Sequence, residues 1–338
     1  MRVDLRSDTV TRPGPAMREA MARAEVGDDV FGDDPTVNRL QASAAERLGF
    51  EGSLFFPSGT QCNLAALMSW CQRGDEYLVS QDAHTYSHEG GGAAVLGSIQ
   101  PQPLELEPDG TIALSRLEAA IKPRDDHFAR TRLLALENTF GGRALPLTFM
   151  REATALARRR GLATHLDGAR FFNATVKLGV EPKTLATLFD SVSICLSKGL
   201  GAPAGSLLLG TRDFLKDARR WRKVLGGGMR QVGVLAAAGQ YALDHHVERL
   251  AVDHQHARDL ASALAGLEGV QVDEPSTNMV WLRVSSQLEG LGAALEARGV
   301  LTTGTSLLRL VLHLDVSAEQ VQFVARVIRE EATRLART

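Results

Sequence analysis

The chain of 338 residues has little of several features that mark specialised proteins. Its three cysteines, Cys62, Cys71 and Cys195, are too few for a disulfide framework and do not match the spacing of metal ligands. No apolar run approaches the roughly 20 residues of a membrane helix, and the first residues lack the apolar core of a signal peptide. We therefore expect a globular cytoplasmic protein with no membrane segment and no metal site.

A strong excess of charge is also absent. The formal net charge of −2 excludes a general attraction to nucleic acid or to anionic lipid. One local exception is the stretch 216–223, in which several cations surround Trp221. These cations fit either the solvated face of a surface helix or a site where one or two of them reach an anionic ligand.

The pattern that is present is typical of an α/β domain followed by a smaller one. Helical and strand-like segments alternate from about residue 36 to 210, which predicts a largely parallel sheet. We expect an extended arm over 1–30, a large domain over 31–245 and a small α+β domain over 246–338. A continuous helix over about 231–267 is predicted to join the two domains.

Individual elements are predicted where the apolar pattern is clearest. In the large domain these are the strands 133–136, 162–166 and 192–196. In the small domain we expect strands at 278–284 and 307–314 and a closing amphipathic helix at 318–335.

Two strand exits carry the residues that indicate chemistry. Lys198 follows an apolar stretch and runs into a Gly-rich turn, where an amine could form a Schiff base with an aldehyde cofactor. Asp167 and Arg170 follow another short apolar segment about thirty residues earlier, which is the length of one strand, helix, strand unit. Asp167 and Lys198 are therefore expected side by side at one edge of a parallel sheet.

Pyridoxal phosphate is the aldehyde cofactor that these residues fit. Gly59 and Thr60 lie where a turn opens a predicted helix, and free N–H groups at a helix start bind phosphate. By itself the Ser-Gly-Thr pattern is also an ordinary helix start. Asp167 would keep the ring nitrogen of the cofactor protonated, so that the ring can accept electrons.

Two histidines and one arginine are further candidates. His84 lies in a loop after a predicted strand, where it could stack on the cofactor or exchange protons near neutral pH, or simply bond to nearby backbone. His127 has the same alternatives. Arg309 lies in an otherwise apolar strand on the same face as Leu307 and Val311, so a purely exposed role is unattractive and a substrate carboxylate is a natural partner.

Two patterns are set aside. The segment 199–204 satisfies a loose dinucleotide pattern, but a strand follows it where a helix would be required. His245, His246, His254 and His256 resemble a metal cluster. However, on a continuous helix the first and last lie about 16 Å apart, so we expect surface histidines unless the helix breaks.

Taken together, the motifs resemble the fold-type-I pyridoxal phosphate enzymes and, more narrowly, the low-specificity L-threonine aldolases. The resemblance covers nearly the whole chain and rests on seven segments in order: Asp4-Leu5-Arg6-Ser7-Asp8-Thr9-Val10-Thr11, Asp33-Asp34-Pro35-Thr36, Pro57-Ser58-Gly59-Thr60-Gln61-Cys62-Asn63, Leu136-Glu137-Asn138-Thr139, His165-Leu166-Asp167-Gly168-Ala169-Arg170, Leu196-Ser197-Lys198-Gly199-Leu200-Gly201-Ala202-Pro203 and Gly226-Gly227-Gly228-Met229-Arg230-Gln231. The chain departs from the family at Phe140, where histidine often follows Glu-Asn-Thr, so a polar role is lost there.

The resemblance implies a role for each matching residue. Lys198 would carry the cofactor, Asp167 would face its ring nitrogen, and His84 would stack on its ring. The substrate carboxylate would be held by Ser7, Arg170 and Arg309, with Arg170 also counted among the cofactor-binding residues. Gly59 and Thr60 would bind the phosphate together with Lys223 and Arg230 of a neighbouring subunit, which implies an obligate homo-oligomer, usually a tetramer.

The function implied is cleavage of L-threonine or L-allo-threonine to glycine and acetaldehyde, within threonine catabolism and glycine biosynthesis. His84, His127 or a held water would take the proton of the β-hydroxyl. Alternatives on the same scaffold are a phenylserine aldolase, a β-eliminating lyase or an aminotransferase. An alternative of a different class is a catalytically silent cofactor-binding scaffold.

Overall fold

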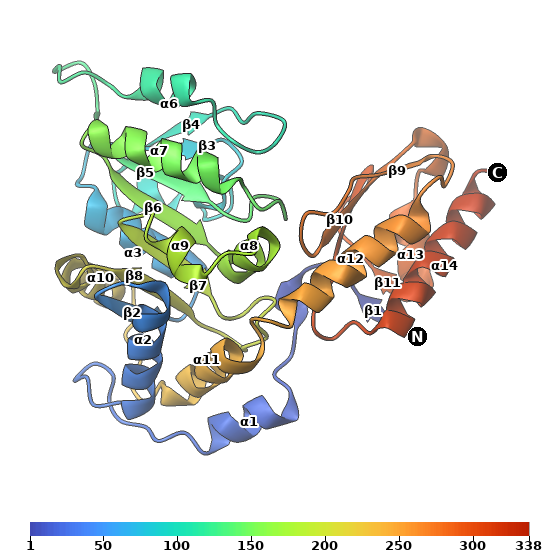
Figure 1. Cartoon of the computed structure of the whole chain (residues 1–338), viewed down its shortest axis with the longest axis horizontal. Coiled ribbons are helices and arrows are strands. Elements are labelled where there is room, and N and C mark those ends of the chain that lie inside the picture. The colour runs from blue at the N-terminus through green and yellow to red at the C-terminus, as the bar shows by residue number, and fades with distance from the viewer. Residues whose placement is uncertain (338) are drawn as a thin grey trace.

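The computed structural model describes residues 1–337, and its largest feature is a seven-stranded sheet with the order β2-β8-β7-β6-β5-β3-β4 (Figure 1). All neighbouring pairs from β7 to β4 are parallel, whereas β8 runs antiparallel to both β7 and β2. The strands are β2 (Gly52–Phe56), β3 (Asp75–Ser80), β4 (Gln100–Leu104), β5 (Arg130–Glu137), β6 (Ala163–Gly168), β7 (Ser191–Cys195) and β8 (Ser206–Gly210). The largely parallel sheet predicted from the alternating pattern is confirmed.

Helices cover both faces of this sheet, because its strands bury side chains on both sides. In β5, Leu134 and Leu136 pack into one apolar cluster while Leu133 and Ala135 pack into another. Period-2 alternation requires this arrangement when both faces are buried. The helices of the large body are α1 (Pro15–Ala22), α2 (Pro35–Leu48), α3 (Gly59–Trp70), α4 (His84–Ser87), α5 (Gly92–Val95), α6 (Leu114–Ala120), α7 (Leu147–Arg159), α8 (Phe171–Leu178), α9 (Pro182–Ala186), α10 (Arg212–Val224) and α11 (Gly233–His245).

A second apolar core lies in the smaller body on the right of Figure 1. Its three-stranded antiparallel sheet has the order β12-β10-β9, and a separate parallel pair joins β1 to β11. The elements are β1 (Val3–Asp4), β9 (Val270–Val272), β10 (Met279–Val284), η2 (Ser286–Leu288), α13 (Leu291–Ala297), β11 (Val300–Leu301), β12 (Leu307–Val311) and α14 (Ala318–Leu335). The predicted closing helix has the predicted bounds, and Ser317 and Gln320 form a capping box at its start.

The long helix predicted over 231–267 is wrong as a single element. The structure has α11 and α12 (Leu250–Leu264), separated by residues 246–249. Val247 and Leu250 pack in the core of the large body, while Ala257 and Leu260 pack in the small one. The break therefore precedes the junction of the two cores, and α12 itself passes from one core to the other, as Figure 1 shows. The predicted domain boundaries themselves remain a prediction.

The first thirty residues are more ordered than an extended arm. They form β1, the 3₁₀ turn η1 (Asp8–Val10) and α1, and they contribute to both cores. Val3 and Leu5 are buried in the small body, and Met17 is buried in the large one. The segment therefore connects the two bodies through packed side chains.

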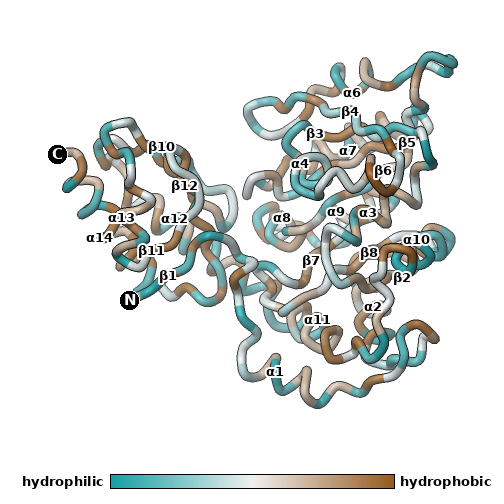
Figure 2. The backbone as a smooth tube through the Cα atoms, turned by 180° about the vertical axis from the view of Figure 1, so that it is seen from behind, coloured by the Kyte–Doolittle hydropathy of each residue, from teal (hydrophilic) through white to brown (hydrophobic). Residues whose placement is uncertain are grey.

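Hydropathy follows the same arrangement. Figure 2 shows brown, apolar backbone along central strands such as β6 and teal, hydrophilic backbone on outer loops. No helix among residues 1–337 combines the length and the apolar character needed to span a bilayer.

Candidate functional site

Three neighbouring strands of the sheet end at the candidate site. Glu137 at the end of β5 is in register with Asp167 on β6, and Asp167 is in register with Ser193 on β7. Lys198 follows β7 by three residues. The parallel pairing of β6 with β7 confirms that Asp167 and Lys198 emerge from adjacent strands at the same edge, where open α/β sheets bind ligands.

Asp167 is a buried carboxylate that is held by two donors. The backbone N–H of Ala169 donates to its Oδ1 at 3.0 Å, and Asn63 Nδ2 donates to its Oδ2 at 2.8 Å. Asp167 is only 3% exposed to solvent. Asn63 is oriented in turn, since Ser193 Oγ donates to its Oδ1 at 2.7 Å. These two donors fix the orientation of the buried carboxylate at the end of β6.

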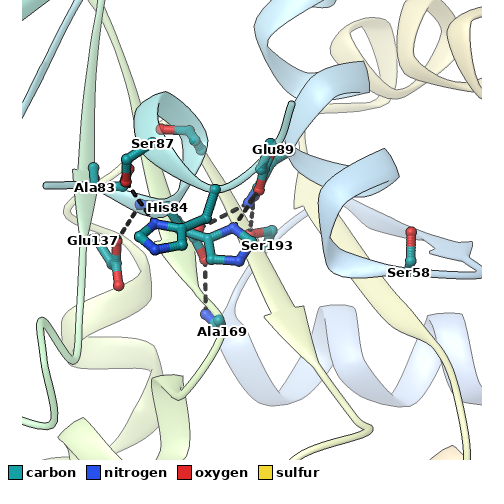
Figure 3. Close-up of polar contacts among 12 residues, drawn as sticks. Ser58, Ala83, His84, Ser87, Glu89, Glu137, Ala169 and Ser193 are labelled. Atoms are coloured by element: carbon teal, nitrogen blue, oxygen red, sulfur yellow. Dashed lines mark hydrogen bonds and ion pairs between the residues drawn. The ribbon is translucent and has the colours of Figure 1, made fainter. Parts of the chain in front are cut away.

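His84 lies between two acidic side chains, as Figure 3 shows. Its backbone N–H donates to Glu137 Oε2 at 2.9 Å, and its ring Nδ1 lies 2.8 Å from Glu89 Oε1. The hydrogen bond to Glu89 raises the pKa of His84, and Asp167 raises it further, against the effect of burial. The predicted loop histidine thus begins the short helix α4 and has a charged partner.

Glu137 is a second acidic group with unusual chemistry. Burial, followed by the negative charge of Asp167, raises the pKa of Glu137 to about 7. The backbone N–H of His84 opposes this shift by stabilising the carboxylate. A proton on Glu137 is therefore available near neutral pH, at the strand end next to Asp167.

The turn that carries Lys198 is fixed through its backbone. Gly201 N–H and the Thr11 hydroxyl both lie within hydrogen-bonding distance of the Lys198 carbonyl, at 2.8 and 3.0 Å. His246 Nδ1 holds the Leu200 carbonyl at 2.6 Å. Within residues 1–337 the structure shows no hydrogen bond from Lys198 Nζ. The side-chain amine is therefore free to move, whereas the backbone of the turn is fixed.

The start of α3 offers backbone donors at the other side of the site. Ser58 caps the helix by accepting from Gln61 N–H, and this leaves the N–H groups of Gly59 and Thr60 without a partner among the described residues. A Cβ added at Gly59 would lie 2.7 Å from Cys195 Sγ on β7. Because Gly59 has no side chain, the first turn of α3 can lie close to β7, the strand that leads to Lys198.

The predicted carboxylate-binding residues gather where the first residues of the chain cross between the bodies. Arg170 donates to both oxygens of Asp8, from Nε at 2.8 Å and from Nη2 at 2.6 Å. Ser7 caps η1 by accepting from Thr9 N–H. Asp8 is fully buried, and although burial alone would raise its pKa, Arg170 holds that pKa below its usual value.

Arg309 reaches the same region from β12. Its Nη2 donates to the Arg6 carbonyl at 3.0 Å, whereas its buried Nε has no partner within the described chain. Burial lowers the pKa of Arg309, and the nearby Arg170 lowers it further. A half-buried cation with an unsatisfied donor, next to a second cation, is arranged to receive an anion.

Three predicted residues are not brought to this cluster within one chain. His127 is 88% exposed and bonds to Asp125, in a loop before β5, whereas the site lies at the far end of that strand. Lys223 is exposed at the end of α10, and Arg230 pairs with Asp28. Their predicted roles stay predictions. The helix does break, and His254, expected on the surface of an unbroken helix, is buried on α12 and bonds to Asn173 on α8.

Sequence reasoning gave no role to several residues that shape the site, namely Asp8, Asn63, Glu89, Glu137 and Ser193. Asp8, Asn63 and Glu137 lie inside motifs that were recognised. Glu89 is five residues after His84, a spacing that on a regular helix would not bring their side chains together. Glu89 contacts His84 because the chain turns after α4.

Comparisons with known proteins agree with this arrangement. A family model described as beta-eliminating lyase matches residues 4–287. The low specificity L-threonine aldolase of Escherichia coli K12 is 56% identical over 324 residues, covering 96% of this chain and 97% of that protein. The probable low-specificity L-threonine aldolase 2 of Arabidopsis thaliana is 45% identical, with 95% of each chain covered.

Solved structures share the fold at lower identity. Threonine aldolase of Leishmania major superposes with a TM-score of 0.82 at 22% identity and covers 97% of this chain and 98% of its own. Serine palmitoyltransferase of Sphingomonas wittichii has a TM-score of 0.78 at 18% identity, with 99% and 88% covered. These likenesses, with the lysine and aspartate on adjacent strands, place the chain in the fold-type-I class.

Sequence identity shows to which family within this class the chain belongs. At 56% identity over nearly the whole length of both proteins, the chain belongs to the low-specificity L-threonine aldolase family.

Proposed function

We propose that this protein cleaves β-hydroxy-α-amino acids such as L-threonine and L-allo-threonine to glycine and an aldehyde, with pyridoxal phosphate as its cofactor. The observation that carries the proposal is that Asp167 on β6 and Lys198, three residues after β7, emerge from adjacent parallel strands opposite the start of α3. Family membership supports the reaction, and the site geometry supports the cofactor.

The residues present fit this cofactor. The partnerless N–H groups of Gly59 and Thr60 would hold its phosphate, Asp167 would face its ring nitrogen, and Lys198 would hold its aldehyde carbon. His84 would stack on its ring. When bound, the cofactor supplies an acceptor for the electrons of the breaking bond.

The carboxylate of the amino acid is the group that the cations would anchor. Arg309 has an unsatisfied Nε, and Arg170 is held in place by Asp8. Ser7 lies one residue from Asp8 and would add a hydroxyl donor. Fixing the carboxylate determines which bond at Cα is aligned for cleavage. This orientation contributes more to the reaction rate than binding of the carboxylate alone.

Two proton movements complete the reaction. The β-hydroxyl must lose a proton as the Cα–Cβ bond breaks and the aldehyde leaves, and Cα must then gain one to give glycine. His84, His127 or a held water would accept the first proton. His84 has the better position within one chain, because its ring already bonds to a carboxylate at the sheet edge.

Assembly is part of the proposal. We expect a cytoplasmic homotetramer in which Lys223 and Arg230 of one subunit approach the phosphate site of another. Exposed apolar side chains such as Phe31, Val95 and Val224 support association. Both cations are exposed in the single chain and could reach outward.

A substrate panel tests the function. Purified protein supplied with pyridoxal phosphate is incubated with threonine, allo-threonine and phenylserine in both Cα configurations, and products are identified. Aldehyde plus glycine is expected, whereas ammonia plus a keto acid would show β-elimination or transamination instead. Lys198→Ala should remove the visible absorbance of the bound cofactor, while Lys177→Ala, a lysine at the end of α8, is the control.

A further inference from the structure

A chain of four buried or half-buried polar groups connects Asp167 to His84. Asn63 Nδ2 donates to Asp167 Oδ2 at 2.8 Å and also to Glu89 Oε1 at 2.9 Å. Glu89 Oε1 then meets His84 Nδ1 at 2.8 Å. One ligand atom each from His84, Glu89 and Asp167 lies within 4.8 Å of the others. Figure 3 shows Glu89 beside the imidazole.

The donor count requires a proton between Glu89 and His84. Both carboxylates accept from the same amide of Asn63, so Glu89 is an acceptor on that side. Two acceptors cannot face each other at 2.8 Å, and a proton must therefore lie between Glu89 Oε1 and His84 Nδ1. With Glu89 ionised, that proton is on Nδ1, and in the neutral ring Nε2 is then the atom with the free lone pair.

Glu89 is unusual because its side chain is only 4% exposed, whereas the His84 side chain is 41% exposed. The carboxylate therefore lies on the inner side of the ring, and solvent or a ligand reaches the outer side. Other charged groups near the ring are Asp167 on β6, Lys198 after β7, Glu137 on β5 and the stacked His88 at the end of α4. None of these groups bonds to a ring nitrogen of His84, whereas Glu89 does.

We propose that Glu89 is a positioning residue, which holds the His84 ring with its proton on Nδ1 and so leaves Nε2 as the atom that exchanges protons in the site. Asn63 keeps Glu89 and Asp167 together by donating to both. The assignment of His84 as the proton acceptor rests on the proposed function, whereas the state of its ring does not.

The direct test measures His84 without substrate. Exchange of the imidazole C2 hydrogen for deuterium, followed by mass spectrometry of peptides across a pH series, reports the protonation midpoint of individual histidines in the full chain. We expect the His84 midpoint above the ordinary histidine value of about 6.5 in the unsubstituted protein. Glu89→Gln should lower the His84 midpoint by about one pH unit, the size of one lost charge-assisted hydrogen bond.

A matched control is Asp125→Asn, which removes the carboxylate next to a different histidine, His127. It should leave the midpoint of His84 in place. A folded Glu89→Gln protein with an unchanged His84 midpoint overturns the proposal. So does an unsubstituted protein in which the midpoint of His84 lies at or below the ordinary histidine value of about 6.5, and this measurement requires no variant to fold.

Kinetics then separate positioning from mere structural support. Glu89→Gln should lower kcat by tenfold or more, shift the acidic limb of the pH profile, and change KM less than twofold. Glu89→Asp should recover part of kcat, because a carboxylate returns. A loss confined to KM would contradict the proposal. Failure of the substrate panel in the unsubstituted protein would instead refute the proposed function and leave the exchange result standing.

Discussion

Arg309 is a half-buried cation whose Nε has no hydrogen-bond partner within the described chain. A substrate carboxylate would satisfy this donor. We therefore expect Arg309→Ala to raise KM about tenfold or more, since a charge-assisted hydrogen bond contributes about 1.5–3 kcal/mol. Steady-state kinetics and the cofactor spectrum measure the effect, and the spectrum should not change. Arg283→Ala removes an exposed cation of the neighbouring strand and should alter neither. Loss of folding in Arg309→Ala would favour a structural role.

Glu137 predicts a dependence of stability on pH. Its pKa is raised from 4.5 to about 7 in the folded protein. The folded state therefore binds more proton than the unfolded state between these values, and the stability contributed by Glu137 is lost as pH rises from about 4.5 to 7. The effect is of order 1–3 kcal/mol. Melting temperatures of the cofactor-free protein at pH 5 and 8 should differ less in Glu137→Gln than in the unsubstituted protein. Glu268→Gln, an exposed control, should leave that difference unchanged.

At the scale of residues, the sequence could predict those whose position follows from strand ends. Asp167 and Lys198 were found because parallel strands about thirty residues apart place their exits together. Glu89 could not be found in this way, because its contact with His84 depends on the turn after α4. His127 illustrates the opposite limit, since a suitable side chain in a suitable stretch lies far along β5 from the site within one chain.

The start of α3 is an element whose packing against β7 limits what Gly59 can become. Gly59→Ala would bring a Cβ to 2.7 Å from Cys195 Sγ, so the helix start must shift. We expect pyridoxal phosphate to bind about tenfold more weakly, because the N–H groups would move away from the phosphate. Absorbance titration measures the Kd. Adding Cys195→Ala should recover most of the affinity, and no recovery in the double variant would rule out this contact as the cause.

Elements were predicted well where an apolar stripe and a cap mark a helix, and poorly where a turn interrupts a continuous helical pattern. Helix α14 has a clear apolar stripe and a capping box, and its bounds were predicted to the residue. The segment 231–267 contains no proline and reads as one helix. In the structure, residues 246–249 form a turn, and α12 then carries the chain from the large core at Leu250 to the small core at Ala257.

At the scale of the whole molecule, Asp8 connects the large body to the small body. It bonds to Arg170 of the large body, and Asn278 of the small body lies 3.4 Å away. Asp8→Asn leaves Arg170 as a buried cation without its counter-charge, which costs about 3 kcal/mol or more. Calorimetry should show a clearly lower Tm. Asp4→Asn removes a more exposed ion pair of the same segment and should lower it far less.

The pairing of β1 with β11 has a consequence for how the chain is made. Val3 lies beside Val300 in a parallel pair, so the residues that leave the ribosome early are completed by residues translated almost three hundred positions later. Such a long-range contact closes late and slowly. While the chain is being translated, the strands of the large body can pair with one another. The N-terminal segment that contains β1 stays unpaired until β11 has been translated. Chaperone dependence during biosynthesis should accordingly concentrate on this leading segment.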